Sequence, residues 1–207
     1  IRDDHNVCYV FQDDGFVKVQ FFSEESNKFY KLMPTGRKTP PTLEISGIRM
    51  HVTKAMDPHK DTIEKVKLIE PVKGRILDTC TGLGYTAIMC MQKGAKEVVT
   101  CEIDDGSETI SKYNPWSNEL FSNENIKRLR GDIFKKIKKM KDKSFDRIIH
   151  DPPRFSLAGL LYSQGFYNEL FRVLKKGGKL YHYTGSPGSK KRGINIVKNV
   201  SERLKKS

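Results

Sequence analysis

The sequence predicts an α/β protein with a doubly wound, mostly parallel sheet and a small N-terminal β-hairpin subdomain. Three observations lead to this fold class. Segments rich in β-branched and aromatic residues fill the first quarter of the chain. Short apolar strands then alternate with helical patterns, which is typical of a parallel sheet covered by helices on both faces. The 207 residues suffice for one domain and a small appendage, which we place at 55–207 and 1–54.

The N-terminal extension is expected to be a β-meander. Segments 16–22 and 29–33 are rich in β-branched and aromatic residues, and the polar link between them suits a hairpin loop. Segment 42–53 reads as a second hairpin that turns at Ser46-Gly47.

The first helix is predicted to begin after this extension. Asp57 is a plausible N-cap, and Pro58 follows at the first helical position, where its missing N–H is tolerated. Ile63, Val66 and Ile69 then fall on one helical face. This face is expected to pack against the sheet.

Strands and helices alternate from there to the end of the chain. Gly94 ends one helix, Pro115 interrupts the next, and Gly177-Gly178 follow a third. Strands are predicted at 74–80, at 97–103, within 126–132, at 145–151 and at 179–184. Helices are predicted at 85–94, from 108 with a break at the proline, at 133–140, at 160–174 and at 194–206.

The net charge of +13 favours a polyanionic partner such as RNA or DNA. The basic run 127–143 is the candidate surface for RNA phosphates. A solvated, lysine-rich surface with no nucleic-acid role accounts for the same charge. Both interpretations stay open.

The composition also argues against several classes of protein. No apolar run approaches the roughly 18 residues of a membrane span, so no membrane partner is expected. No leader segment is visible, although the chain begins with Ile1 rather than Met. The four cysteines lack C-x-x-C spacing, so we expect no metal site, and we expect reduced thiols in a cytoplasmic protein.

The first chemical motif is ILDTCTGLGYTA, residues 76–87. A strand ends at Asp78, a loop with Gly82 and Gly84 follows, and a helix begins. The glycines would let the backbone approach a ligand closely, and the helix N-terminus offers N–H groups. A tight strand–helix turn without a ligand gives the same pattern.

Acidic residues also follow the next two strands. Glu102 ends the second strand, where α/β proteins often place the partner of a ribose diol. Asp132 follows the third strand and could accept a hydrogen bond from an adenine amino group, with Ile133 and Phe134 beside the ring. A solvent-exposed acid at Glu102 and a helix N-cap at Asp132 are the structural alternatives.

The fourth motif is HDPPRF, residues 150–155. Proline cannot continue a central strand, so the fourth strand must end at Asp151. Because the carboxyl ends of parallel strands meet at one sheet edge, we expect the four acidic residues to lie along that edge. A proline-rich turn with no further role is the structural alternative.

Together these motifs resemble the class I S-adenosylmethionine-dependent methyltransferases, which have a Rossmann-like fold, over roughly residues 57–207. The family's first loop usually reads acid-x-Gly-x-Gly-x-Gly, and here Cys80 replaces the first glycine. The resemblance implies S-adenosyl-L-methionine as the cofactor, although dinucleotide-binding folds share the glycine loop and the second-strand acid. The implied cofactor-binding residues are Asp78, Thr81, Gly82, Gly84, Glu102, Ile103, Asp132 and Ile133.

The motif Asp/Asn-Pro-Pro-aromatic marks family members that methylate planar or exocyclic nitrogens. Here Arg154 takes the fourth place and the aromatic residue follows it. The resemblance implies catalytic roles for Asp151, Pro152, Pro153 and Phe155. The prolines would fix the turn so that Asp151 and a backbone carbonyl accept the hydrogens of one amino group, while the ring stacks on the base.

Two more specific resemblances follow from the whole pattern. With segments 114–117 and 181–188, the chain looks most like a group of archaeal methyltransferases. The N-terminal hairpins before this core also resemble spermidine synthases, which are polyamine aminopropyltransferases. A non-catalytic RNA-binding module is the third possibility. Class I sheets normally close with an antiparallel hairpin after the last helix, and we expect it to be missing here.

Overall fold

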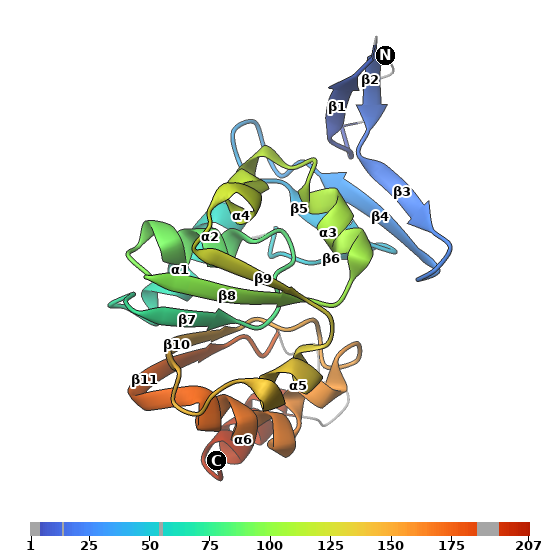
Figure 1. Cartoon of the computed structure of the whole chain (residues 1–207). Helices are drawn as coiled ribbons and strands as arrows, with labels where there is room; N and C mark the ends of the chain where they lie inside the picture. The colour runs from blue at the N-terminus through green and yellow to red at the C-terminus, as the bar shows by residue number, and fades with distance from the viewer. Residues whose placement is uncertain (1–4, 14, 54–55, 186–194) are drawn as a thin grey trace.

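The main domain is built on a five-stranded parallel sheet (Figure 1). The computed structural model describes residues 5–13, 15–53, 56–185 and 195–207. The strand order is β11-β10-β7-β8-β9, and all neighbours are parallel. The strands are β7 (Arg75–Asp78), β8 (Glu97–Glu102), β9 (Ile126–Arg130), β10 (Phe145–His150) and β11 (Leu174–His182). The predicted α/β fold class is confirmed.

Helices cover both faces of this sheet. Successive side chains of a strand point to opposite faces and therefore pack into two different hydrophobic clusters. Ile76 of β7 packs with α1, α2 and α4, whereas Leu77 packs with α5, α6 and α7. The α-helices are α1 (Pro58–Lys67), α2 (Tyr85–Gln92), α3 (Asp105–Ser111), α4 (Asn118–Ser122), α5 (Ile133–Lys136), α6 (Gln164–Val173) and α7 (Ile196–Leu204). Short 3₁₀ turns are η1 (Pro115–Ser117), η2 (Ile137–Lys139) and η3 (Gly159–Tyr162).

The predicted start of the first helix is confirmed. The Asp57 side chain accepts hydrogen bonds from the backbone N–H groups of His59 and Lys60, at 2.9 and 3.1 Å. Val66 and Ile69 are fully buried. The cap and the apolar face together fix α1 against the sheet.

The N-terminal extension forms two small antiparallel sheets. The strands are β1 (Tyr9–Gln12), β2 (Gly15–Lys18), β3 (Gln20–Ser23), β4 (Lys28–Met33), β5 (Thr42–Ile45) and β6 (Ile48–Arg49). The first two pair as a hairpin that projects beyond the body of the molecule (Figure 1), and the other four form the second sheet. Ser46 and Gly47 have φ values of 46° and 81°, so the predicted turn is confirmed.

Two predicted strand boundaries are wrong, and the helix expected from residue 108 already begins at Asp105. The expected strand 16–22 divides at Val19, because its N–H turns to the Cys8 carbonyl while its carbonyl accepts from Leu32. The strand expected at 179–184 already begins at Leu174, directly after α6, and its pairing with β10 shifts register across the glycine pair. Residues 54, 55, 186–188 and 194, on which other predictions fall, lie outside the described residues.

The second N-terminal sheet shares a hydrophobic cluster with the main domain. Val19, Tyr30, Leu32 and Leu43 pack against three buried residues at the start of α2 and in α3, namely Leu83, Tyr85 and Ile110. A boundary near residue 54 stays a prediction. Within the described part of the chain, no helix has both the length and the apolar character needed to cross a membrane.

One close contact of this docking is between Tyr30 and Gly106. A Cβ added to Gly106 in α3 would overlap the Tyr30 ring, whereas one added to Gly165 in α6 would meet no atom within 4 Å. We expect Gly106→Ala to lower the free energy of unfolding by about 1–3 kcal/mol through overpacking. Gly165→Ala, the matched control, should raise it by up to about 1 kcal/mol. Urea denaturation measures both, and equal effects would contradict this docking.

Candidate active site

Four acidic residues lie along one edge of the main sheet, as predicted. Asp78 and Glu102 are the last residues of β7 and β8, Asp132 follows β9 closely, and Asp151 follows β10 directly. These four strands are consecutive neighbours in the order β10-β7-β8-β9. The sheet therefore brings the candidate cofactor and acceptor residues to a common edge.

Asp78 is fully buried, and its hydrogen bonds hold the elements on either side of the glycine loop. Its two carboxylate oxygens accept hydrogen bonds from Thr86 Oγ1 at 3.1 Å and Thr100 Oγ1 at 2.8 Å. Burial raises the pKa of this carboxyl to about 7, although the two hydroxyls oppose the rise. Asp78 thereby ties the first turn of α2 to β8.

The two loop glycines have different tasks. Both have positive φ, 52° at Gly82 and 80° at Gly84. A Cβ at Gly84 would press on Leu120, so this glycine is needed for packing. A Cβ at Gly82 would meet no atom within 4 Å, so this glycine faces open space. Thr81, directly before Gly82, is buried, with its Oγ1 2.6 Å from Thr100 Oγ1.

Glu102 closes the loop from the neighbouring strand. Its Oε2 accepts from the Gly82 N–H at 2.8 Å, and its Oε1 accepts from the N–H groups of Ile103 and Asp104 at 3.0 and 2.9 Å. Burial raises the pKa of Glu102 above its ordinary value, against these three hydrogen bonds. Since a carboxylate oxygen can accept two bonds, Oε2 can take one further donor.

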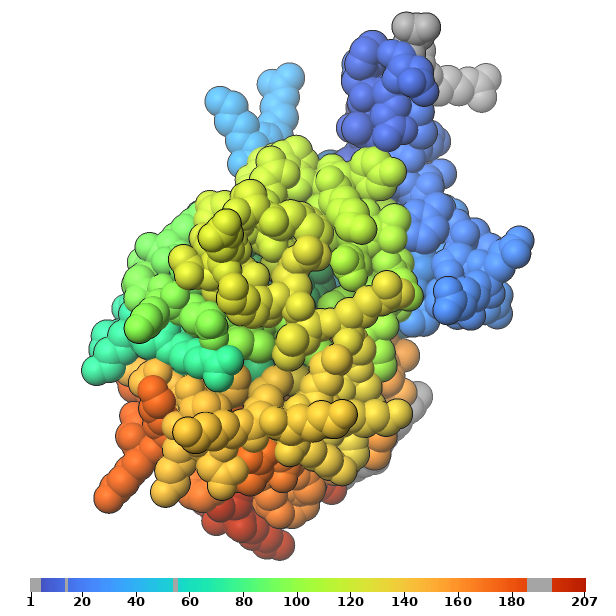
Figure 2. Space-filling view, viewed as in Figure 1, coloured from blue at the N-terminus to red at the C-terminus, as the bar shows by residue number. Residues whose placement is uncertain are grey.

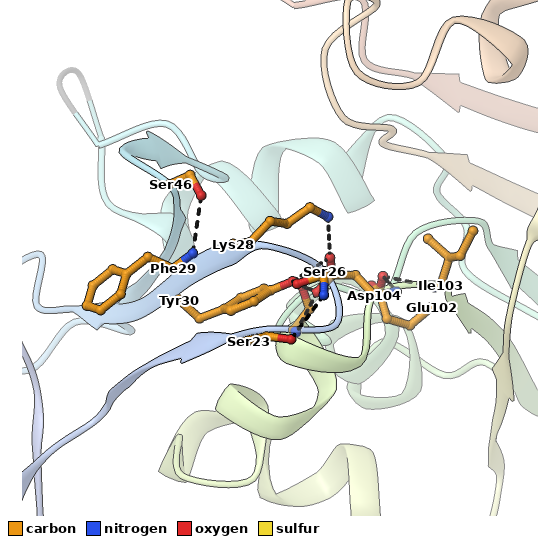
Figure 3. Close-up of polar contacts among 10 residues, drawn as sticks. Ser23, Ser26, Lys28, Phe29, Tyr30, Ser46, Glu102, Ile103 and Asp104 are labelled. Atoms are coloured by element: carbon orange, nitrogen blue, oxygen red, sulfur yellow. Dashed lines mark hydrogen bonds and ion pairs between the residues drawn. The ribbon is translucent and has the colours of Figure 1, made fainter.

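The N-terminal sheet reaches this site through Asp104 (Figure 3). Lys28 Nζ and Tyr30 OH both donate to Asp104 Oδ2, at 2.7 and 2.9 Å. Burial acts to raise the pKa of Asp104, but these donors and the Ser107 N–H hold it below its ordinary value. Asp104 thus links the extension to the turn that carries Glu102.

Segment 114–117 supports the loop through fully buried polar groups. Ser117 Oγ donates to the Leu83 carbonyl at 2.7 Å, and Asn114 Nδ2 donates to Tyr85 OH at 2.9 Å. The Tyr85 hydroxyl in turn donates to the Pro41 carbonyl at 2.8 Å. No separate role for this segment was predicted from the sequence. The available signal was the Asn114-Pro115 pair, which is typical of a turn that begins with a side-chain cap.

The third strand end fits the structural alternative. Asp132 caps α5 by accepting from the Phe134 N–H at 2.9 Å. The Ile133 side chain is buried in the core, whereas that of Ile103 is 65% exposed. A role for Asp132 toward an adenine stays a prediction.

A cavity of about 170 Å³ lies beside the contact between Gly82 and Glu102. Its lining comes from the glycine loop, β8, α3, α4 and β9. Figure 2 shows a hollow between the yellow-green and the yellow atoms of this part of the chain. Pockets that enclose a small ligand usually measure roughly 300–1,000 Å³. The cavity therefore has room for only part of a nucleoside.

Asp151 is paired with a buried lysine that the sequence did not single out. Lys65 Nζ of α1 lies 2.7 Å from Asp151 Oδ2 and 2.6 Å from Asp61 Oδ2. Burial acts to lower the pKa of Lys65, but the two carboxylates outweigh it and hold that pKa above its ordinary value. Burial raises the pKa of Asp151, and Lys65 opposes the rise. The spacing of Asp61 and Lys65 by four residues was the available signal.

The proline turn after β10 is held by an aromatic residue. Pro152 is buried, and the Pro153 carbonyl accepts from Tyr162 OH at 3.0 Å. Phe155 is 44% exposed and meets the Tyr162 ring edge-on, with centroids 5.5 Å apart. Among the described residues none donates to the Pro152 carbonyl. The turn therefore presents Asp151, one carbonyl and an exposed ring.

The histidines near this edge have structural surroundings. His150 hydrogen-bonds Thr79 Oγ1 at 2.7 Å and the Leu161 carbonyl at 3.0 Å, and its ring contacts His182. Burial lowers the pKa of His150 well below its ordinary value, and that of His51 to about 3. These rings remain neutral near pH 7 and are poor candidates for proton transfer.

The basic run 127–143 has two kinds of cation. Arg128 and Arg130 of β9 pair with Glu108 and Asp105 of α3. The exposed lysines after them are Lys135, Lys138, Lys139, Lys141 and Lys143. Contact of this run with RNA stays a prediction.

The raised pKa of Asp78 leads to a prediction about stability. An unfolded Asp ionises near pH 4, so between about pH 4 and pH 7 the folded chain holds a proton that the unfolded chain has lost. The free energy of unfolding therefore falls as pH rises through this window. Asp78→Asn should remove this titration. The free energy of unfolding of the variant, minus that of the parent, should therefore rise by about 2 kcal/mol from pH 5 to pH 8.

Urea denaturation at both pH values checks this expectation. Glu124→Gln, at an exposed position, is the control and should follow the parent at both values. If Asp78→Asn also follows the parent, the carboxyl is not held protonated by burial.

Comparisons with known proteins agree with this geometry. The family model described as Methyltransferase small domain matches residues 62–191. The uncharacterized protein MJ1233 of Methanocaldococcus jannaschii is 49% identical over 207 residues, which cover this whole chain and 69% of that protein. The ribosomal RNA large subunit methyltransferase I of Aeromonas salmonicida is 28% identical over 196 residues, or 86% of this chain and 48% of that protein.

A solved structure shares the fold. A spermidine synthase in complex with the transition-state analogue AdoDATO superposes with a TM-score of 0.70 at 18% identity. The match covers 90% of this chain and 63% of that one. Since the family model matches more than half of the residues, the chain belongs to the methyltransferase small domain family.

Proposed function

We propose that this chain is an S-adenosylmethionine-dependent methyltransferase that acts on a nitrogen of a planar amino substrate. The observation that carries the proposal is the placement of Asp151 and its proline turn beside the strands that hold Gly82 and Glu102. One sheet edge thus offers a nucleoside-binding half and an acceptor half. Membership of the archaeal DPPRF group is part of the same proposal.

The cofactor half offers polar and apolar contacts suited to the ribose end of S-adenosylmethionine. Glu102 Oε2 has capacity for a ribose hydroxyl, and the open side of Gly82 lets a ligand approach the loop. The exposed Ile103 side chain offers apolar contact. The bound cofactor would supply a sulfonium methyl that is already reactive, so the chain's own task is positioning.

The acceptor half fits a neutral amino group. Lys65 uses Asp151 Oδ2, and among the described residues none donates to Oδ1. Oδ1 and the Pro152 carbonyl are each able to accept one hydrogen of an –NH₂ group. Two such bonds would direct the nitrogen lone pair, while the exposed Phe155 offers its ring to a base.

RNA is the substrate class that we favour. The exposed lysines in 135–143 flank the third strand end and suit phosphates. The relative from Aeromonas salmonicida, by its name, methylates ribosomal RNA. Both observations support RNA over a small free amine.

Aminopropyl transfer is the second candidate, favoured by the fold shared with a spermidine synthase, which includes the N-terminal part of this chain. A diamine substrate must lose a proton from an ammonium group before it can attack. This requires an acid that is available as a base. The pairing of Asp151 with Lys65 weighs against this candidate.

Glu102→Ala tests the cofactor half. Loss of a charged acceptor should weaken binding of S-adenosylhomocysteine by about 1–3 kcal/mol, or roughly 5- to 150-fold. Glu97→Ala, at the opposite end of β8 in an ion pair with Arg75, is the matched control and should bind as the parent does. Calorimetric titration gives the affinities. Unchanged affinity in Glu102→Ala would remove this residue from the cofactor site.

Asp151 variants test the acceptor half. We expect Asp151→Ala to slow methyl transfer from labelled cofactor to total RNA by at least about 100-fold, the scale of positioning effects. Asp151→Asn should keep part of the rate, because an amide oxygen still accepts a hydrogen bond. For aminopropyl transfer to putrescine, Asn should be as damaging as Ala, since it cannot take a proton.

Two controls accompany this series. Thermal melting shows whether each variant is folded, and S-adenosylhomocysteine titration shows whether the cofactor half is intact. Full activity in a folded Asp151→Ala variant would exclude the proline turn from the site. No turnover with any acceptor, together with RNA binding, would favour a non-catalytic module.

A further inference from the structure

We propose that Lys65 determines the charge of substrate that the acceptor half admits. Its ammonium group occupies the cation position beside Asp151, so the site accepts a neutral amino group and excludes an ammonium ion. The inference rests on the proposed function for the statement that Asp151 faces the acceptor. It assigns to α1, which precedes every strand of the main sheet, a specificity-determining residue.

The Lys65 side chain is more deeply buried than that of Asp151. The Lys65 side chain is 8% exposed, whereas that of Asp151 is 22% exposed. Nζ lies between two carboxylates, 2.7 Å from Asp151 and 2.6 Å from Asp61. It also lies 5.2 Å from the centroid of the Tyr183 ring, a further favourable contact for a cation. Two carboxylates and one aromatic ring therefore surround the ammonium group.

The frame around Lys65 gives it little freedom to leave. Val66 of α1 and Ile69 just after the helix are fully buried, and the Asp57 cap fixes the start of the helix. His51 is hydrogen-bonded to Thr42 and remains neutral, so it adds no second cation. Lys65 is thus a fixed part of the site.

The charges of this cluster account for the selection. Asp61 and Asp151 are two carboxylates, and Lys65 forms an ion pair with each of them. A substrate ammonium that approached Asp151 would meet the Lys65 cation behind the same carboxylate, which disfavours binding. A neutral amino group needs only a hydrogen-bond acceptor, and Asp151 Oδ1 supplies it. Without Lys65, both carboxylates would be available to a cationic amine.

Putrescine is the probe that tests the proposal. Calorimetric titration of putrescine compares the parent, Lys65→Met and Lys67→Met. Lys67 lies two residues further along α1 and is exposed, so its variant is the matched control. We expect no measurable binding to the parent or to Lys67→Met. Lys65→Met should bind putrescine measurably, with an affinity at least about tenfold above the detection limit of the titration, and adding Asp151→Asn should abolish this binding.

Two results would overturn the proposal. The first is a folded Lys65→Met variant that binds putrescine no better than the parent. The second is putrescine binding by the parent itself that Asp151→Asn removes, and this result needs no Lys65 variant, so it stands if Lys65→Met fails to fold. The titrations contain no cofactor and therefore report on Lys65 alone. Absence of S-adenosylhomocysteine binding to the parent, measured separately, would instead contradict the proposed function.

Discussion

The site depends on a network of buried hydrogen bonds that holds the loop between β7 and α2. Asp78 receives the hydroxyls of Thr86 and Thr100, and Ser117 donates to the Leu83 carbonyl. A buried polar group left without a partner costs about 1–3 kcal/mol, so each bond restrains the rest of the network. The loop conformation that leaves Gly82 open to a ligand is therefore set by buried side chains beneath and behind the loop.

The N-terminal extension belongs to this arrangement rather than standing apart from it. Tyr30 and Lys28 hold Asp104, whose own N–H donates to Glu102. The Pro41 carbonyl receives the Tyr85 hydroxyl at the start of α2. A shift of the small sheet would therefore act on both the second-strand acid and the helix that follows the glycine loop. The Tyr30 ring resting on Gly106 gives this coupling a rigid contact.

Local patterns predicted most of the fold, because strands, helices and caps are encoded by nearby residues. The alternation after Asp57, the turn at Ser46-Gly47 and the row of strand-end acids all follow from short-range rules. Lys65 escaped prediction because its partner Asp151 is 86 residues away. The start of β11 depends on a register shift against β10, and no local signal carries that information. The burial of Ile133 and the exposure of Ile103 likewise depend on tertiary packing.

The arginines of β9 have a consequence for intermolecular association. β9 is an edge strand of the parallel sheet, and such strands expose backbone groups that can pair with another chain. Its sequence, IKRLR, places Lys127, Arg128 and Arg130 along that edge, with the two arginines anchored to α3. Charged side chains on an edge strand, even when they are ion-paired, disfavour its pairing with another chain because their charges would have to be desolvated. The charged residues of β9 thus count against edge-to-edge association, whatever else the basic run contacts.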